Sequence, residues 1–147
     1  MNNLISELRI RINTLPNSFL KYSEVELQYK SSPEKWSKKE ILGHLIDSAQ
    51  NNIRRIVVGQ YREKERIVYD QNKWVQAAEY QHYNSKNLIQ FWAMINEHFC
   101  ILLENLPNSS YTTLTDWGHD TSEYVSLEFA AKDYLRHMDH HIKQMNL

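Results

Sequence analysis

The stretch Ser37-Lys-Lys-Glu-Ile-Leu-Gly-His-Leu-Ile-Asp-Ser-Ala49 opens the segment that decides the fold. Ser37 with Glu40 three residues later has the pattern of a capping box, in which the two side chains satisfy free backbone N–H groups at a helix start. Apolar residues follow at steps of three and four as far as Val57, which is the period of one helix face. Gly59 is a typical stop signal. The pattern predicts a long amphipathic helix over residues 37–59.

The same periodicity occurs in three further segments. Residues 2–15 carry an apolar stripe, and we expect Pro16 to end that helix because proline removes a backbone donor. Residues 85–106 repeat the pattern up to Pro107, and the last segment runs from residue 126 to the end of the chain. Four amphipathic helices of this length predict an all-α fold, a four-helix bundle.

The connections between these helices agree with one domain over residues 1–147. Gly and Pro occur only three times each, which is too few for an all-β fold with many tight turns. Residues 16–36 are expected to be a mixed connector with a short helical turn at 19–22, and residues 107–124 to be polar and turn-rich. Residues 60–84 form a long connection without a clear period, which we expect to be functional or to carry small helices.

Charge and hydropathy exclude several classes of protein. The net charge of -1 argues against a general nucleic-acid binder, which needs a basic patch. The one basic cluster comprises Arg54, Arg55, Arg62, Lys64 and Arg66. Because glutamates interrupt it, it is interpreted as a solvated helix end and loop. No apolar run approaches the ~20 residues of a membrane span. The start of the chain shows no signal region, so a cytoplasmic protein is expected.

The single cysteine, Cys100, lies between apolar neighbours and is interpreted as a small buried hydrophobe and not as a catalytic thiol. Four aromatic residues near helix ends are interpreted mainly as packing, with the lining of a pocket mouth as the alternative; they are Trp36, Tyr69, Trp74 and Trp117.

Two of the seven histidines, His137 and His141, stand one turn apart on a ridge that also holds Tyr134. That ridge borders the apolar stripe, so both imidazoles are expected to point toward the core, whereas His140 falls on the solvent side. Two imidazoles at this spacing can reach one ion at the ~2 Å of a Zn–N bond. The spacing alone is a weak signal, because a hydrogen-bonded pair of core histidines is the commoner arrangement.

His44 is the third inward-leaning histidine, next to the buried face of the segment 37–59. His98 competes with it and is not excluded by periodicity. Asp47, one turn after His44, is either a carboxylate that orients a ligand or an acid on the helix surface. Tyr134 is the aromatic residue expected closest to the metal.

Taken in order along the chain, these residues resemble the DinB/YfiT-like superfamily. The resemblance covers about residues 36–144 and is carried by three motifs. The first is Gly43-His-Leu-Ile-Asp-Ser-Ala49, followed by Asn51 or Asn52 and by Arg54 or Arg55. The second is Tyr69-Asp-x-x-x-Trp74, and the third is Tyr134-x-x-His137-x-x-His140-His141-x-x-Gln144. It implies an up-down-down-up bundle with a long crossover between the second and third helices. It also implies a divalent metal on His44, His137 and His141, with His140 outside the ligand set.

The resemblance further implies an activity, since characterised members include bacillithiol-using transferases and a mycothiol-dependent isomerase. We therefore expect a metal-dependent transferase that uses a low-molecular-weight thiol with a small-molecule substrate, and a homodimer is plausible. Three histidine nitrogens leave a coordination position open, which is typical of catalytic zinc, although Ni, Fe or Cu also suit imidazoles. The alternatives are a metal-dependent hydrolase and a non-catalytic binding module braced by its metal.

Overall fold

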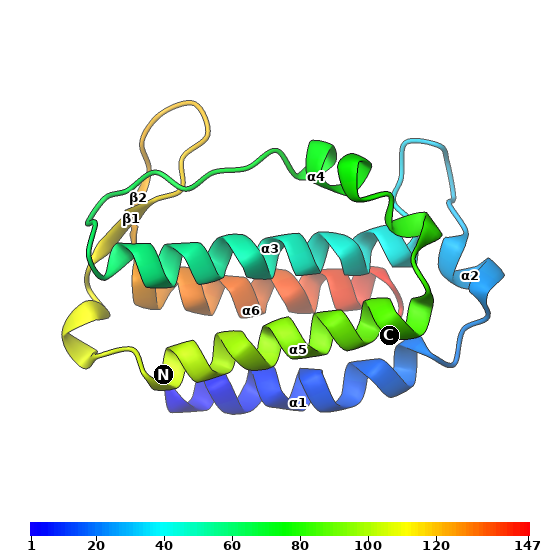
Figure 1. Ribbon diagram of the computed structural model, residues 1–147, viewed down its shortest axis with the longest axis horizontal. Coiled ribbons are helices and arrows are strands. Elements are labelled where there is room, and N and C mark those ends of the chain that lie inside the picture. Colours follow the sequence, from blue (N-terminus) through cyan, green and yellow to red (C-terminus); the bar gives the residue numbers. More distant parts are fainter.

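The computed structural model describes residues 1–147 and shows a bundle of four long helices (Figure 1). They are α1 (Asn2–Phe19), α3 (Lys38–Gly59), α5 (Ser85–Glu104) and α6 (Leu127–Gln144). In Figure 1, α1 and α6 run in one direction and α3 and α5 in the other, so the expected up-down-down-up order is confirmed. Helix α3 packs against α5 and α6, while α1 packs mainly against α5.

The connections carry the smaller elements. These are α2 (Glu24–Gln28), α4 (Gln71–Ala78), the 3-10 turns Tyr80–His82 and Asn108–Ser110, and the strands β1 (Leu114–Asp116) and β2 (Tyr124–Ser126). The crossover that joins the parallel helices α3 and α5 runs along α3 and contains α4, which confirms that the long connection carries small helices (Figure 1). The antiparallel pair of β1 and β2 was not predicted, because three-residue strands are too short to show a period.

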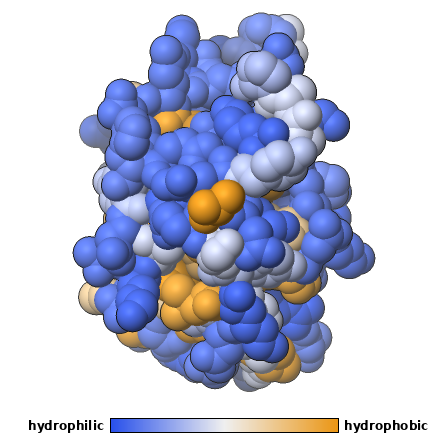
Figure 2. All heavy atoms as spheres, turned by 90° about the vertical axis from the view of Figure 1, so that its right-hand side faces the viewer, coloured by the Kyte–Doolittle hydropathy of each residue, from blue (hydrophilic) through white to orange (hydrophobic).

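The apolar stripes of the four long helices meet in one core. Its largest fully buried side chains come from α1, α5 and α6 and include Phe19, Trp92, Phe99 and Tyr134. The end of the bundle shown in Figure 2 is largely hydrophilic and carries separate, small apolar patches. None of the helices combines the length and the apolar character needed to cross a membrane.

Two features near the first helix differ from the sequence-based expectations. Helix α1 does not end at Pro16 but continues to Phe19, because Leu15 and Phe19 lie on one face and are both buried. Proline near the last turn removes one hydrogen bond, and the packing of these two side chains offsets that loss. Helix α2 was missed, although Ser23 and Glu26 form a capping box like that of Ser37 and Glu40.

The basic cluster is only in part the solvated helix end that the sequence predicts. Arg54 is exposed, whereas Arg55 is 8% exposed and donates to the backbone oxygen of Ile67 in the crossover. Arg66 donates to the carbonyl oxygens of Gly118 and His119. The solvated interpretation is therefore wrong for Arg55, because one helix position separates a solvent-facing side chain from one that faces the crossover.

Tyr80 fastens the crossover to α3 at two points. Its ring occupies the space that a side chain at residue 43 would need, because a Cβ added to Gly43 would lie 2.0 Å from the Tyr80 ring atom Cδ2. Its hydroxyl donates to Oδ1 of Asp47 at 2.6 Å. Asp47 is 2% exposed, and its second oxygen, Oδ2, has no partner. Burial raises the pKa of Asp47 from 3.8 to about 6, although the Tyr80 hydrogen bond opposes the shift.

The contact between Gly43 and Tyr80 predicts that Gly43→Ala destabilises the protein. Overpacking of this kind costs roughly 1–3 kcal/mol, more than the ~1 kcal/mol that alanine gains over glycine inside a helix. Urea unfolding of both proteins measures the difference. Gly59→Ala is the matched control, because its new Cβ would meet the movable end of the Leu127 side chain at 2.7 Å. A Gly43→Ala protein as stable as the wild type would contradict the packing.

The raised pKa predicts that Asp47→Asn stabilises the metal-free protein at pH 7.5. The wild type gains stability from the protonated carboxyl, and this gain is lost as the pH rises from about 4 through the folded pKa of about 6. The asparagine avoids this loss, which amounts to roughly 3 kcal/mol at most. Unfolding curves at pH 4, 6 and 7.5 test this, with the exposed Asp120→Asn as control. A difference that does not change with pH would refute the assignment.

Candidate metal centre

Helices α3 and α6 bring three histidines together from distant parts of the chain. The Nε2 atoms of His44 and His141 each lie 3.1 Å from Nε2 of His137. One ligand atom from each residue lies within 4.8 Å of the other two. Because α3 and α6 are antiparallel neighbours, a residue early in α3 lies beside residues late in α6 (Figure 1). The three residues singled out in the sequence therefore form one cluster.

The three rings meet edge to face, and one aromatic residue packs against His44. The ring planes of His44 and His137 are 85° apart, and those of His137 and His141 are 88° apart. The ring of Trp36, just before α3, lies 4.9 Å from that of His44. Trp36 is the aromatic side chain in contact with the cluster, a role that the sequence assigned to Tyr134.

The environment keeps the imidazoles neutral. Burial, together with His137 and His141, lowers the pKa of His44 to about 3. Burial and the neighbouring His141 lower the pKa of His137 to about 4, and burial also lowers that of His141. A neutral imidazole has a free lone pair, which is the form that binds a metal. The ligand-competent form is thus present throughout the neutral pH range.

Two neighbouring side chains orient the rings. Nδ1 of His141 lies 2.8 Å from Oε1 of Gln144, and Nδ1 of His137 lies 3.4 Å from Oγ of Ser48. Such contacts to the second ring nitrogen fix which nitrogen faces a metal. Sequence reasoning missed these roles, although Ser48 follows His44 by one turn and Gln144 closes the third motif. Nδ1 of His44 is buried without a partner.

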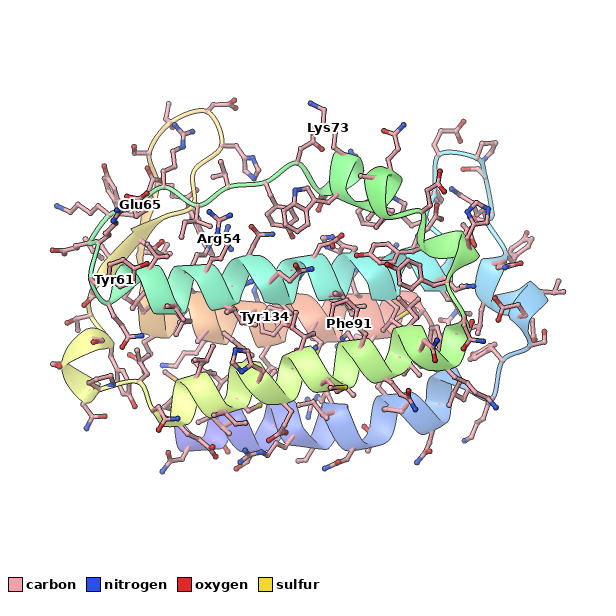
Figure 3. The ribbon with its side chains drawn as sticks, viewed as in Figure 1. Arg54, Tyr61, Glu65, Lys73, Phe91 and Tyr134 are labelled. Carbon is pink, nitrogen blue, oxygen red and sulfur yellow. The ribbon has the colours of Figure 1, made fainter.

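The remaining candidates take other positions. Asp47 is neither on the surface nor bonded to a histidine, since its carboxyl accepts from Tyr80. Tyr134 lies between α3 and α5 in Figure 3, and its hydroxyl donates to Oδ1 of Asn96 on α5. His98 and His140 are exposed and stand outside the cluster. Cys100 is buried as expected, and burial raises the pKa of its thiol to about 11.

A cavity of about 140 Å³ opens beside His137, between α3, α6 and the crossover. It is lined mostly by polar side chains and by three of the aromatic residues noted in the sequence. The lining residues are Ser48, Asn52, Arg55, Tyr69, Trp117, Asp133, Tyr134 and His137. A wider hollow on the outer face of α6 contains none of the three clustered histidines. The cavity beside His137 is therefore the one that adjoins the cluster.

The donor set fits a divalent transition metal. Nitrogens bound at about 2.0–2.1 Å to a tetrahedral ion are roughly 3.3 Å apart, close to the two measured separations. Neutral imidazoles can fill such separations with a hydrogen bond only where one Nε2 carries a proton, whereas one metal ion would satisfy all three lone pairs at once. His44, with Nδ1 buried, has only Nε2 facing the cluster. Neutral imidazoles suit Zn, Ni, Cu and Fe better than the harder Mg or Ca ions.

Solved structures with the same fold give a wider context. One of them is YfiT from Bacillus subtilis, which is described as a probable metal-dependent hydrolase with an unusual four-helix bundle topology. It has a TM-score of 0.89 at 20% sequence identity, and the match covers 99% of this chain and 83% of that chain. A mycothiol-dependent maleylpyruvate isomerase has a TM-score of 0.76 at 10% identity, with 96% of this chain and 59% of that chain covered. At these identities the likeness shows the fold.

The family is shown by a different comparison. A search of curated protein sequences finds no match. The family model of the DinB superfamily, however, matches residues 7–145, which include most of α1, the whole of α3, α5 and α6, and the three histidines. The chain belongs to the DinB superfamily.

Proposed function

We propose that this protein is a metal-dependent enzyme that presents a low-molecular-weight thiol to an electrophilic small molecule. The observation that supports this proposal is the open donor set. His44, His137 and His141 supply three nitrogens, and no fourth histidine, cysteine or carboxylate joins their cluster. Structural zinc sites are usually closed by four protein ligands, whereas catalytic sites keep one position free.

The residues around the cluster have separable tasks. A divalent ion held there would favour the deprotonated form of a thiol or of water. Ser48 and Gln144 hold the rings of His137 and His141 in place. Trp36 covers His44 and keeps solvent from that side. The cavity beside His137 offers the substrate a polar pocket next to the open position.

The choice of thiol transfer over hydrolysis rests on the proton that each reaction must remove. Asp47 accepts from Tyr80, Glu40 accepts from the backbone N–H of Ser37, and Asp70 caps α4, so none of these three is bonded to a histidine. Asp133, on the wall of the cavity beside His137, accepts from Arg136. A thiol, with an ordinary pKa near 8.5, needs far less help to lose its proton than water does. The thiol dependence of the mycothiol-dependent isomerase, which shares the fold, agrees with this choice.

Hydrolysis is the second candidate, and one comparison favours it. YfiT, which has the higher TM-score of the two structures compared, is described as a probable metal-dependent hydrolase. Three imidazoles with an open position also suit the activation of water without a nearby carboxylate. The two reactions differ in one requirement, since hydrolysis proceeds without any thiol.

The proposed ligand set predicts that His44→Ala, His137→Ala or His141→Ala removes most of the bound metal. Loss of an orienting partner costs roughly 10–100-fold in metal affinity, so Gln144→Ala should weaken binding by that factor and loss of a ligand by more. Elemental analysis and calorimetric titration with Zn and Ni measure both effects. The exposed His140→Ala is the control and should bind as the wild type does. Full metal content in His137→Ala would rule out the site.

The proposed reaction predicts that metal-loaded protein consumes bacillithiol or a related thiol when an electrophile such as 1-chloro-2,4-dinitrobenzene is present. Chelation should abolish the reaction and added metal should restore it. A parallel assay with p-nitrophenyl esters and no thiol tests hydrolysis. Ester turnover alone would favour the second candidate. If chelation lowers only the melting temperature and neither reaction occurs, the metal braces the two helices without catalysis.

A further inference from the structure

We propose that the cavity beside His137 is an anion subsite, in which the Arg55 guanidinium binds a carboxylate or a similar anionic group of the substrate. This inference rests on the proposed function, because it assigns a chemical class to the small molecule that the enzyme would use. It concerns the end of the cavity that lies away from the histidines. The substrate would then carry its reactive atom toward His137 and its anionic group toward Arg55.

Arg55 is a buried cation without a counter-ion. Arg55 is 8% exposed, and no carboxylate oxygen lies within 4.0 Å of its guanidinium, although lysine and arginine side chains form ten ion pairs elsewhere in the chain. Burial lowers the pKa of Arg55, as expected for a charge removed from water. Arginine nevertheless stays protonated at neutral pH. An unpaired buried charge is costly, and an anionic ligand would offset that cost.

The hydrogen bonds of Arg55 leave donors free for a ligand. Nε and Nη2 both donate to the backbone oxygen of Ile67, at 3.2 and 2.8 Å. Nη1 makes only a long contact of 3.4 Å to Oδ1 of Asn52. A guanidinium has five N–H donors in a planar fork, so two remain unassigned. The Ile67 contact fixes the plane of the fork, and a fixed fork suits two parallel bonds to a carboxylate.

The one acidic residue of the cavity wall is not in direct contact with Arg55. Oδ1 of Asp133 accepts from Nε of Arg136 at 2.9 Å. The charge of Asp133 acts on Arg55 from beyond salt-bridge distance and opposes the lowering of the pKa of Arg55 by burial. Arg54, next to Arg55 in sequence, is exposed and rises from α3 in Figure 3, so it is not part of the lining. Arg55 is therefore the cation of the lining, and the acid of the lining already has a direct partner in Arg136.

The position of Arg55 matches a substrate that reaches from the histidines along α3. His44, Ser48, Asn52 and Arg55 follow at steps of four, four and three residues, which places them along one face of the helix. Ser48 contacts His137, and at a rise of 1.5 Å per residue Arg55 lies about 10 Å further along the axis. A helical side chain leans toward the helix start, which brings the guanidinium back toward Asn52. A small acid can span this gap.

Tyr69 extends the cavity toward solvent. It lines both the cavity beside His137 and a second hollow of about 390 Å³, whose other lining residues are Asp70, Gln71 and His119. At about 140 Å³ the inner cavity is smaller than the roughly 300–1,000 Å³ of whole ligand pockets. It therefore suits the part of a substrate that runs from the reactive atom to the anionic group, and any larger remainder would lie in the outer hollow.

Titration of the ¹⁵N-labelled, metal-free protein at pH 7.5 with propionate tests the subsite without any contribution from a metal. The Nε–Hε signal of Arg55, assigned with Arg55→Lys, should shift and saturate. Neutral propionamide of the same size should leave it in place. Arg55→Gln should weaken propionate binding about 10–100-fold, the value of one or two bonds to a charged group. Arg54→Gln, with the same change of net charge, should bind within a factor of two of the wild type.

Three results would overturn the subsite: equal binding of propionate by Arg55→Gln, an equal loss in Arg54→Gln, or equal binding of propionamide. If Arg55→Gln does not fold, the signal shift in the wild type still decides the question. Inorganic phosphate, titrated in parallel, shows whether the subsite prefers a planar carboxylate. The proposed enzyme function and the anion subsite can fail separately. A protein that binds propionate but no metal would contradict the enzyme function alone. An active metal-dependent enzyme that does not bind propionate would contradict the subsite alone.

Discussion

Three imidazole rings are in contact with one another between α3 and α6. The cluster is stable without a metal only while each ring remains uncharged. The lowered pKa values of His44 and His137 express this constraint, because a proton on one ring would place a buried charge beside its neighbours. The topology brings the rings together. A long crossover lets α3 and α5 run parallel, and α6 then returns antiparallel to α3 (Figure 1). The ring centroids of His44 and His141 consequently lie 4.9 Å apart.

Most of the fold was predictable because it depends on long, strongly periodic helices. The capping box at Ser37, the stripes on all four helices and the length of the crossover each indicated the bundle, and the structure confirms it. The errors lie where tertiary packing outweighs a local signal. Pro16 fails to end α1 because Phe19 is buried beyond it. The strand pair is too short to show a period, and its partners become visible only in three dimensions.

The site was predictable in part, and the limit is again spatial. Helical spacing identified His137 and His141, and only the resemblance to a known family selected His44 over His98. Sequence reasoning could not identify what contacts the rings, since Trp36 and Ser48 reach them from elements whose relative placement depends on the bundle. It also treated Arg55 as solvated, because adjacent positions on a helix can face water and the interior. The features that suggest chemistry therefore lie between helices.

We propose that one divalent ion binds to His44, His137 and His141 and keeps a coordination position that no protein atom fills. X-ray absorption spectroscopy of the zinc-loaded protein tests this coordination. We expect three imidazole nitrogens at about 2.0–2.1 Å and one further light donor that exchanges with added thiol, which would appear as sulfur at about 2.3 Å. A spectrum with four imidazoles, or one that His137→Ala leaves unchanged, would contradict it.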